Sequence, residues 1–326
     1  MKGMVFNMGK FIKDETGISA IITALVMTII LTATALALDI GAAYVDASYA
    51  QNAADAIALS IGEYLPVEQN DQSSKTMILA AANEFALKNG VYDLKTEDVI
   101  FCGLEDGKYK SVSVSVKKTS VTKLAKIIGV DNIKITKSAT VSSKPVGSIK
   151  GAVPIGITED AYDTAMATGN TQHVILKVGG GDGVNGFYGF IVLDDSNGNA
   201  VVLEKWMKYG YEFENYVGEI LPIATGDKTS VVRDGVNYRL SLCNHYVGYD
   251  GCKVAHYVED CPRVVFVLIY RFVNTNTVEI VGFAPFILEP SNKDDEIQGS
   301  FLDINISYTE KITEKDCGTY TYRLTG

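Results

Sequence analysis

The sequence is organised around one stretch, ISAIITALVMTIILTATALALDIGAAYVDASYAQNAADAIALSIGEYL, which occupies residues 18–65. Its first part, from Ile18 to Leu38, carries no charged side chain. About 20 apolar residues are enough for a helix to cross the hydrocarbon core of a bilayer. A single span must satisfy its own backbone hydrogen bonds, and only a helix does so. The segment is therefore predicted to be a transmembrane helix.

The helical pattern continues beyond the apolar segment. From Asp39 to Leu65 the chain is rich in alanine and contains no proline. At about 1.5 Å per residue the whole rod would be roughly 70 Å long. Beyond the membrane its apolar side chains recur at helical spacing, at Ile40, Tyr44, Ala47, Ala54, Ile57 and Ile61. We expect this stripe to pack either on the chain's own exported part or on neighbouring subunits.

Charge predicts the orientation in the membrane. Basic residues precede the apolar segment, at Lys2, Lys10 and Lys13, and acidic residues follow it, at Asp39, Asp46 and Asp55. Since basic flanks stay in the cytoplasm, we expect a single-pass protein of the cytoplasmic membrane with its N-terminus inside and its C-terminal part outside. The net charge of −10 and the lack of a Lys/Arg cluster argue against a nucleic-acid partner.

Two kinds of proteolytic processing are open alternatives to this anchor. Small residues in LALDIGAA, residues 36–43, offer a signal-peptidase site, although the apolar run is longer than a usual signal core. A prepilin-type leader would end at Gly17, with cleavage before Ile18. Type IV prepilins usually carry Glu five residues into the mature chain, and this chain has Ile22 there.

The rest of the chain predicts an α+β protein. We expect a cytoplasmic lead-in at 1–17, the long helix at 18–65, a small α+β sandwich at 66–142, a linker at 143–152 and a β-rich exported domain at 153–326. In the sandwich, a helix from Ser73 or Ser74 to about Lys88 precedes hairpin strands at 99–104 and 109–116, a short helix at 121–128 and a strand at 133–141. In the last domain only 159–167 and 204–209 read as helical.

The segment DIGAAYVDASYAQNAADAIALS resembles the signature that follows the membrane helix in TadE/TadG-like proteins of the Tad, or Flp-type, pilus system. The resemblance is specific over this helix and looser beyond it, in AVPIGIT, VILKV, CPRVV and VEIVGFAPFILE. It implies a structural or assembly role, with other Tad membrane proteins or pilin-like subunits as partners. The residues expected to form a helix-packing interface are Asp39, Gly41, Tyr44, Gln51, Asn52, Ala54 and Asp55.

The chain has five cysteines, at Cys102, Cys243, Cys252, Cys261 and Cys317. Three of them lie close in sequence to His245 and His256, in CNHYVGYDGCKVAHYVEDC. The spacing contains no C-x₂-C pair, so it is not typical of a zinc site. In an exported domain, a disulfide among Cys243, Cys252 and Cys261 is the leading interpretation, with free thiols and zinc as alternatives.

The remaining motifs do not predict catalysis or a cofactor. Gly181, Gly183 and Gly186 satisfy G-x-G-x-x-G, but a strand follows them where a dinucleotide site needs a helix. IVLDDSNGN is interpreted as a solvated turn rather than a weak Ca²⁺ site. We expect neither a metal nor enzymatic activity. The rival hypotheses are a membrane-anchored adhesin or ligand-binding module, and an exported enzyme that pairs Cys243 or Cys261 with His256.

Overall fold

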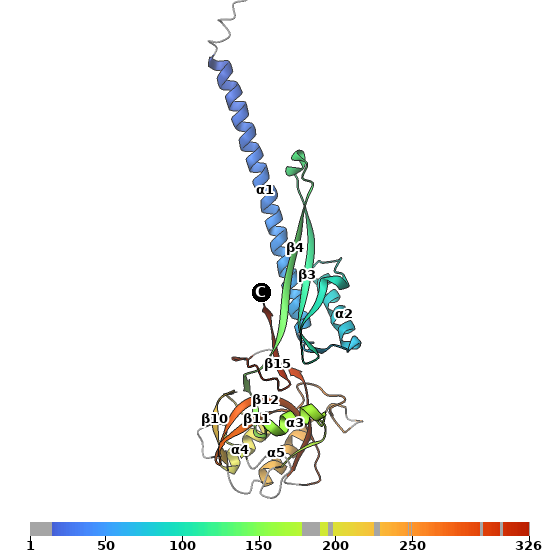
Figure 1. The fold of residues 1–326 in the computed structure, drawn as a ribbon, viewed down its shortest axis with the longest axis vertical. Coiled ribbons are helices and arrows are strands. Elements are labelled where there is room, and N and C mark those ends of the chain that lie inside the picture. Colours follow the sequence, from blue (N-terminus) through green and yellow to red (C-terminus); the bar gives the residue numbers. More distant parts are fainter. Residues whose placement is uncertain are drawn as a thin grey trace, which may run out of the picture.

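The computed structural model describes residues 15–177, 190–194, 198–224, 229–246, 248, 250–293, 296–306 and 309–325. The molecule is elongated: one long helix projects from one end, a β-hairpin runs beside the lower half of that helix, and a rounded body lies at the other end (Figure 1). Helices and two main sheets are both present, so the predicted α+β class is confirmed.

The long helix is α1, Glu15–Gly62, and it is continuous over 48 residues. It ends three residues before Leu65, the end that the sequence predicted. A Cβ atom at Gly62 would lie 2.5 Å from the ring of Tyr322 and 2.8 Å from Val141. Glycine at this position therefore allows the last turn of α1 to approach the sheet closely.

The first sheet has the strand order β1-β3-β4-β15-β14, and β2 also pairs with β3. Its elements are β1 (Val67–Glu68), β2 (Val99–Glu105), β3 (Lys108–Val121), β4 (Asn132–Pro145), β14 (Ile304–Asn305) and β15 (Thr319–Thr325), with helix α2 (Gln72–Lys88) and the 3₁₀ turns η2 (Thr96–Asp98) and η3 (Ala125–Ile128). Helix α2 is capped by the side chain of Asp71, which accepts from the N–H groups of Ser73 and Ser74. The structure differs from the prediction at 121–128: in place of the expected short helix, this segment contains the 3₁₀ turn η3.

Helices α1 and α2 pack on one face of this sheet. Strand β3 alternates, so Val112, Val114 and Val116 are buried while the serines between them are half-buried. Their partners in the core include Ala50, Ala53, Ala54, Ile57, Ala58 and Ile61 of α1 and Ile78, Ala82 and Ala86 of α2. The lower part of the predicted stripe on α1 therefore packs on the chain's own sheet, the first of the two expected interpretations.

The distal body is built on a second sheet with the order β6-β11-β12-β10-β8, extended by β13 and β7. The strands are β6 (Ala152–Thr158), β7 (Val174–Lys177), β8 (Phe190–Ile191), β10 (Ile220–Ala224), β11 (Val264–Asn274), β12 (Thr277–Glu289) and β13 (Glu296–Phe301). Strands β5 (Ser148–Lys150) and β9 (Glu214–Tyr216) form a separate pair. Three helices pack around the body: α3 (Glu159–Thr168), α4 (Ala200–Tyr209) and α5 (Thr229–Leu242).

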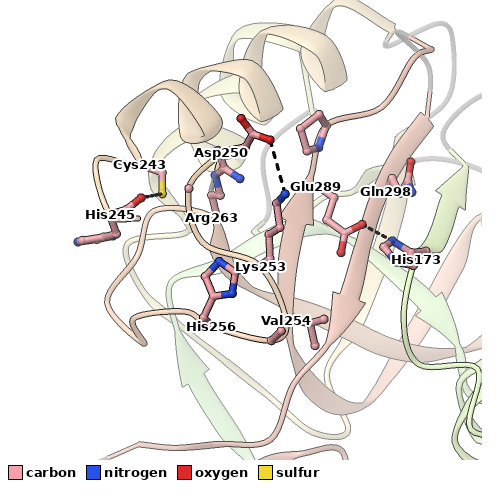
Figure 2. Close-up of a pocket in the computed structure, with 13 residues that line it drawn as sticks. His173, Cys243, His245, Asp250, Lys253, Val254, His256, Arg263, Glu289 and Gln298 are labelled. Carbon is pink, nitrogen blue, oxygen red and sulfur yellow. Dashed lines mark hydrogen bonds and ion pairs between the residues drawn. The ribbon is translucent and has the colours of Figure 1, made fainter. Parts of the chain in front are cut away.

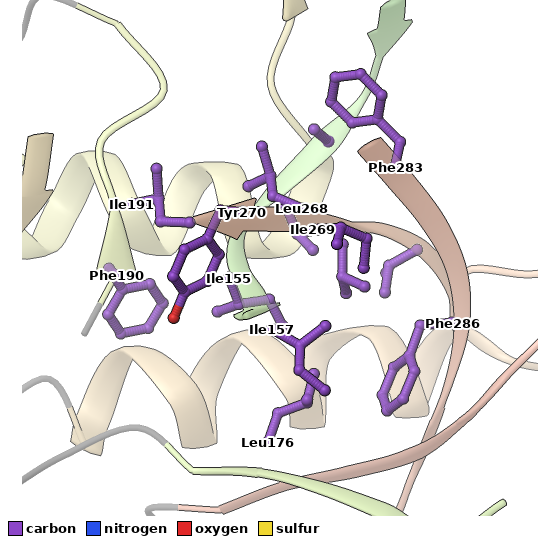
Figure 3. Close-up of a cluster of buried hydrophobic side chains, with 14 of the residues drawn as sticks. Ile155, Ile157, Leu176, Phe190, Ile191, Leu268, Ile269, Tyr270, Phe283 and Phe286 are labelled. Carbon is purple, nitrogen blue, oxygen red and sulfur yellow. The ribbon is translucent and has the colours of Figure 1, made fainter. Parts of the chain in front are cut away.

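The core of this body is apolar and largely aliphatic. Figure 3 shows Ile155 and Ile157 of β6 beside Leu268, Ile269 and Tyr270 of β11, with aromatic rings at either side. Strand β6 pairs in parallel with β11. At Gly156 a Cβ atom would lie 2.2 Å from the carbonyl oxygen of Leu268. A side chain there is excluded by the neighbouring backbone, so the pairing requires glycine.

Two sequence predictions about the second half are wrong. Residues 143–152 do not form a linker, because β4 runs to Pro145, β5 follows at Ser148–Lys150 and β6 begins at Ala152. The final strand also leaves the distal body: β15 pairs antiparallel with β4, from Tyr320 opposite Pro145 to Thr325 opposite Thr140. The C-terminal end of the chain therefore completes the first sheet. Helix α5 was not predicted.

Several sequence predictions lie outside the described residues. These are the basic lead-in up to residue 14, the glycine-rich loop with Gly181, Gly183 and Gly186, and part of the segment IVLDDSNGN. Of that last segment, Asn199 is described, and its side chain accepts a hydrogen bond from the N–H of Val202 as the N-cap of α4.

The burial of Ala54 generates a stability prediction. Its side chain is fully buried between α1 and the sheet, so Ala54→Leu should overpack this contact and lower the free energy of unfolding by about 1–3 kcal/mol. Urea titration of the detergent-solubilised full-length chain, followed by circular dichroism, measures the change. The matched control is Asn52→Leu on the exposed side of the same turn, which should change stability by less than about 0.5 kcal/mol. Equal effects of the two substitutions would contradict this packing.

Candidate membrane anchor and helix interface

The upper half of α1 is exposed along almost all of its apolar length. None of its most apolar window is buried inside the structure, and among the described residues this is the one helix long and apolar enough to cross a membrane. Side chains such as Ile29 and Leu31 are more than 60% exposed. The hydroxyls of Thr23, Thr28, Thr32 and Thr34 each donate to the carbonyl four residues earlier. The helix thus satisfies its polar side chains internally, as lipid surroundings require.

Asp39, the first residue beyond the apolar segment, fastens the helix to the end of the β3–β4 hairpin. Its carboxylate accepts from the backbone N–H groups of Lys123, Leu124 and Ala125, at 2.9, 2.8 and 2.5 Å. These bonds, that to Ala125 first, outweigh the effect of burial and hold the pKa of Asp39 below its usual value. The contact is therefore fully formed above the pKa of an unfolded Asp and weakens as pH falls through the lower folded value.

The end of the hairpin, residues 121–132, is here called the hairpin tip. It presents apolar side chains to the surroundings: Val121 is 68% exposed, Ile127 is 83% exposed and Val130 is 42% exposed. Between the tip and α1 lies an apolar groove of about 300 Å³, lined by Leu31, Thr32, Ala35, Leu36, Leu124, Ala125 and Ile127. The tip therefore lies at the level of the last turns of the apolar segment, with Lys123 and Lys126 beside its apolar side chains.

Further polar contacts join α1 to the hairpin below Asp39. Asp46 forms an ion pair with Lys118 at 3.2 Å. Hydrogen bonds from Ser120 and then Lys118 lower the pKa of Asp46. The Lys118 ammonium also lies 4.1 Å from the centre of the Tyr49 ring. One turn further, Gln51 donates to Asp55 at 2.8 Å and to the carbonyl of Ser138 in β4 at 3.3 Å. The helix and the hairpin are thus tied together along several turns.

The predicted interface residues divide into two groups. Asp39, Gln51, Ala54 and Asp55 are buried or half-buried and make contacts within the chain. The others lie on the opposite side of α1, where side chains at helical spacing face away from the sheet; this outer face consists of Gly41, Tyr44, Val45, Ser48 and Asn52. Tyr44 is 77% exposed, and a Cβ atom at Gly41 would meet nothing within 4 Å. Of the predicted interface residues, Gly41, Tyr44 and Asn52 are the ones exposed to another helix.

Far from the membrane helix, the structure gathers four potential metal ligands in the distal body. The Sγ atoms of Cys243, Cys252 and Cys261 and a ring nitrogen of His245 all lie within 4.8 Å of one another. All five cysteines of the chain are free thiols in this structure. The sequence places both His245 and His256 near these cysteines and does not single out His245 as a ligand. The sequence signal for His245 is its position two residues after Cys243. This spacing alone does not show that His245, rather than His256, lies next to the thiols.

The thiols of this cluster differ in acidity. Burial opposes ionisation of Cys243, but hydrogen bonds from the N–H of Cys252 and from the Cys261 thiol outweigh burial and lower its pKa to about 6. Burial raises the pKa of Cys261 to about 12. The ring of His256 instead lies against Tyr246, with 4.9 Å between ring centres. His256, the partner of Cys243 or Cys261 in the rival enzyme hypothesis, is not among the four groups whose ligand atoms converge.

A comparison with protein-family models finds a match over most of helix α1. Residues 17–60 match the model of a family described as Flp pilus-assembly TadE/G-like, which confirms the resemblance inferred from the sequence over this helix. The match covers the apolar segment, Asp39 and the outer face. The comparison with curated proteins and the comparison with solved structures each found no match.

The contact at Asp39 generates a second prediction. Asp39→Asn keeps the side-chain shape but leaves one acceptor oxygen and turns a donor NH₂ toward the N–H groups of the hairpin tip. The tip should detach from α1, and trypsin should cleave after Lys123 and Lys126 several-fold faster in the detergent-solubilised chain. Asp93→Asn, at an exposed carboxylate, is the matched control and should leave these rates unchanged. Unchanged cleavage in the Asp39 variant would show that the carboxylate does not hold the tip.

Proposed function

Because residues 17–60 are a TadE/G-like segment of Flp pilus assembly, we propose that this protein is a structural component of a Tad pilus machinery, anchored in the cytoplasmic membrane by α1. The observation that carries the proposal is the division of this one helix. Its apolar half is almost entirely exposed, and its other half is fastened to the β3–β4 hairpin by Asp39 and to the first sheet by buried alanines. The helix therefore holds the body at a fixed distance from the bilayer.

The proposed orientation places the body outside the cell. Lysines precede the span and aspartates follow it, the pattern of an N-terminus retained in the cytoplasm. Uncleaved anchoring is proposed over prepilin-type processing, because Ile22 occupies the place of the usual glutamate. A role in packing and seating other subunits is proposed rather than catalysis, since the sequence contains no known catalytic motif.

The outer face is the proposed contact with pilin-like or other Tad membrane subunits. Gly41 and Ser48 allow the backbone of another helix to approach closely. Tyr44 and Val45 add exposed apolar area just beyond the membrane, and Asn52 adds a hydrogen-bonding amide. This face is continuous with the exposed apolar segment. A partner helix that spans the membrane beside α1 would therefore meet the outer face without bending away.

The hairpin tip is proposed to rest in the bilayer interface beside the helix. Its exposed Ile127 and Val130 are apolar, and the groove that it shares with Leu31 and Leu36 continues into the apolar segment. Lys123 and Lys126 can extend their ammonium groups to the headgroups while their stems remain in apolar surroundings. The tip would then give the anchor a second point of contact and fix the tilt of the body.

An anchored adhesin or ligand-binding module is the second candidate. It is supported by an open cleft of about 830 Å³ in the distal body, lined by charged and polar groups that include His173, Lys253, Arg263 and Glu289 (Figure 2). Deletion of the gene separates the candidates. Loss of pili supports the assembly role, whereas pili that form normally on cells that no longer adhere support the adhesin.

The proposed partner contact predicts the outcome of site-specific crosslinking. A photoreactive phenylalanine analogue at Tyr44 should crosslink to pilin-like or other Tad membrane subunits in cells, identified by mass spectrometry. The matched control is the same analogue at Tyr92, which is 81% exposed but lies on the loop after α2. Tad subunits should be absent from its adducts. The same adducts from both positions, or none with Tad subunits at Tyr44, would refute the outer face as the contact.

The proposed lipid contact predicts the behaviour of a tryptophan at the hairpin tip. In vesicles of phosphatidylcholine with brominated acyl chains, the added fluorescence of Ile127→Trp should be strongly quenched. The control is Val201→Trp, which is 77% exposed on α4 of the distal body and should not be quenched. The native Trp206 is buried in that body and contributes a constant background. Equal quenching of the two variants would place the tip outside the bilayer.

A further inference from the structure

We propose that Cys243, His245, Cys252 and Cys261 bind one Zn²⁺ ion, in a site that fastens the loop between α5 and β11. The inference rests on the four ligand atoms, which converge within 4.8 Å although they come from positions spread over 19 residues of sequence. It is independent of the membrane anchor and of the proposed pilus role. It also selects zinc from the three interpretations that the cysteine spacing left open, which were a disulfide, free thiols and zinc.

The geometry fits a tetrahedral ion. With Zn–S bonds of about 2.3 Å and Zn–N bonds of about 2.0 Å, tetrahedral ligands lie about 3.8 Å apart for two sulfurs and about 3.5 Å apart for sulfur and nitrogen. The Sγ atom of Cys252 lies 3.6 Å from Nδ1 of His245. A disulfide would use two of the three thiols and would leave the third beside His245 without a role. Zinc uses all four groups.

The chain path builds the site from ends of regular elements. Cys243 directly follows α5, which ends at Leu242, and Cys261 lies three residues before β11. Between them a turn with positive φ at Asp250 and Gly251 brings Cys252 inward. At Gly251 a Cβ atom would lie 2.6 Å from the Arg263 guanidinium and 3.0 Å from Sγ of Cys243. Glycine is thus needed both for the turn and for space beside the thiol.

Groups around the ligands support a metal-bound thiolate cluster. The backbone N–H of Cys252 donates to Sγ of Cys243 at 3.4 Å, a contact that stabilises negative charge on sulfur. Arg263, buried beside the site, donates from Nη1 to the carbonyl of Cys252 at 3.2 Å. Three thiolates and one Zn²⁺ carry a net charge of −1, which the guanidinium balances. Figure 2 shows Cys243, His245 and Arg263 at one end of the cleft.

The site is of the structural kind. Four protein ligands leave no open coordination position for water or substrate, unlike a catalytic zinc. The buried members of the apolar cluster beside this loop are Cys252, Cys261, Ile287, Leu302 and Ile304, and two of these five are proposed metal ligands. Metal ligation would therefore add stability at the centre of this cluster.

The test measures metal in the full-length chain, purified in detergent without a histidine tag or chelator. Mass spectrometry of metal content should find about one zinc per chain. The Cys252→Ser/Cys261→Ser double variant should lose it, while Cys102→Ser, a substitution of a cysteine in the first sheet, should keep it. Replacement by Co²⁺ in the wild-type chain should produce the intense visible bands of a tetrahedral thiolate site, and this result does not depend on any variant folding.

Other results would overturn the proposal. A denatured, unreduced wild-type chain that is lighter by two hydrogen atoms and carries no metal would establish a disulfide. Full mass without any metal after zinc is supplied would establish free thiols. Zinc that remains in a folded double variant, or cobalt without thiolate bands, would place the metal elsewhere. Removal of zinc by a chelator should also lower the melting temperature of the wild-type chain, and addition of zinc should restore it.

Discussion

The structure depends on the contact between one carboxylate and three backbone N–H groups. Asp39 is the first polar side chain after the apolar segment, and it accepts all three bonds from the hairpin tip. Without it, a hairpin of two 14-residue strands would be held to α1 only by the contacts lower down. With it, the hairpin is joined to α1 from the end of the apolar segment down to the first sheet. In the proposed function, this joint fixes how the folded part sits relative to the bilayer.

The residues of the signature divide between two sides of α1. In the signature, aspartate, glutamine and the paired alanines lie on the side of α1 that meets the sheet, while Gly41, Tyr44 and Asn52 lie on the outer face. The pattern therefore combines two requirements. One is imposed by the chain's own fold, and the other is proposed to come from a partner. Sequence alone cannot separate them, because both use small and polar residues at helical spacing.

Local patterns predicted the elements well where they are strongly periodic. The long helix, α2 and the alternating strands β3 and β4 follow from apolar spacing, and Gly129 ends η3 in the left-handed conformation as a stop signal should. The failures have physical causes. Helix α5 contains Gly235 and adjacent valines, which lower helix propensity. Residues 143–152 contain glycine, serine and proline, yet long-range pairing places most of them in strands. The proposed ligand His245 became identifiable only when folding brought Cys252 and Cys261 to it, which sequence spacing does not encode.

The return of β15 to the first sheet has a consequence for the order of events during biogenesis. Tyr320 pairs with Pro145, so the second neighbour of β4, strand β15, is made only after the distal body has been synthesised, whereas the first neighbour, β3, precedes β4 in the chain. An emerging chain would expose the unpaired backbone edge of β4 until β15 has been synthesised. Completion of the first sheet must therefore wait for β15, and a chain interrupted before this strand would keep α1 but leave that edge open to pairing with other chains.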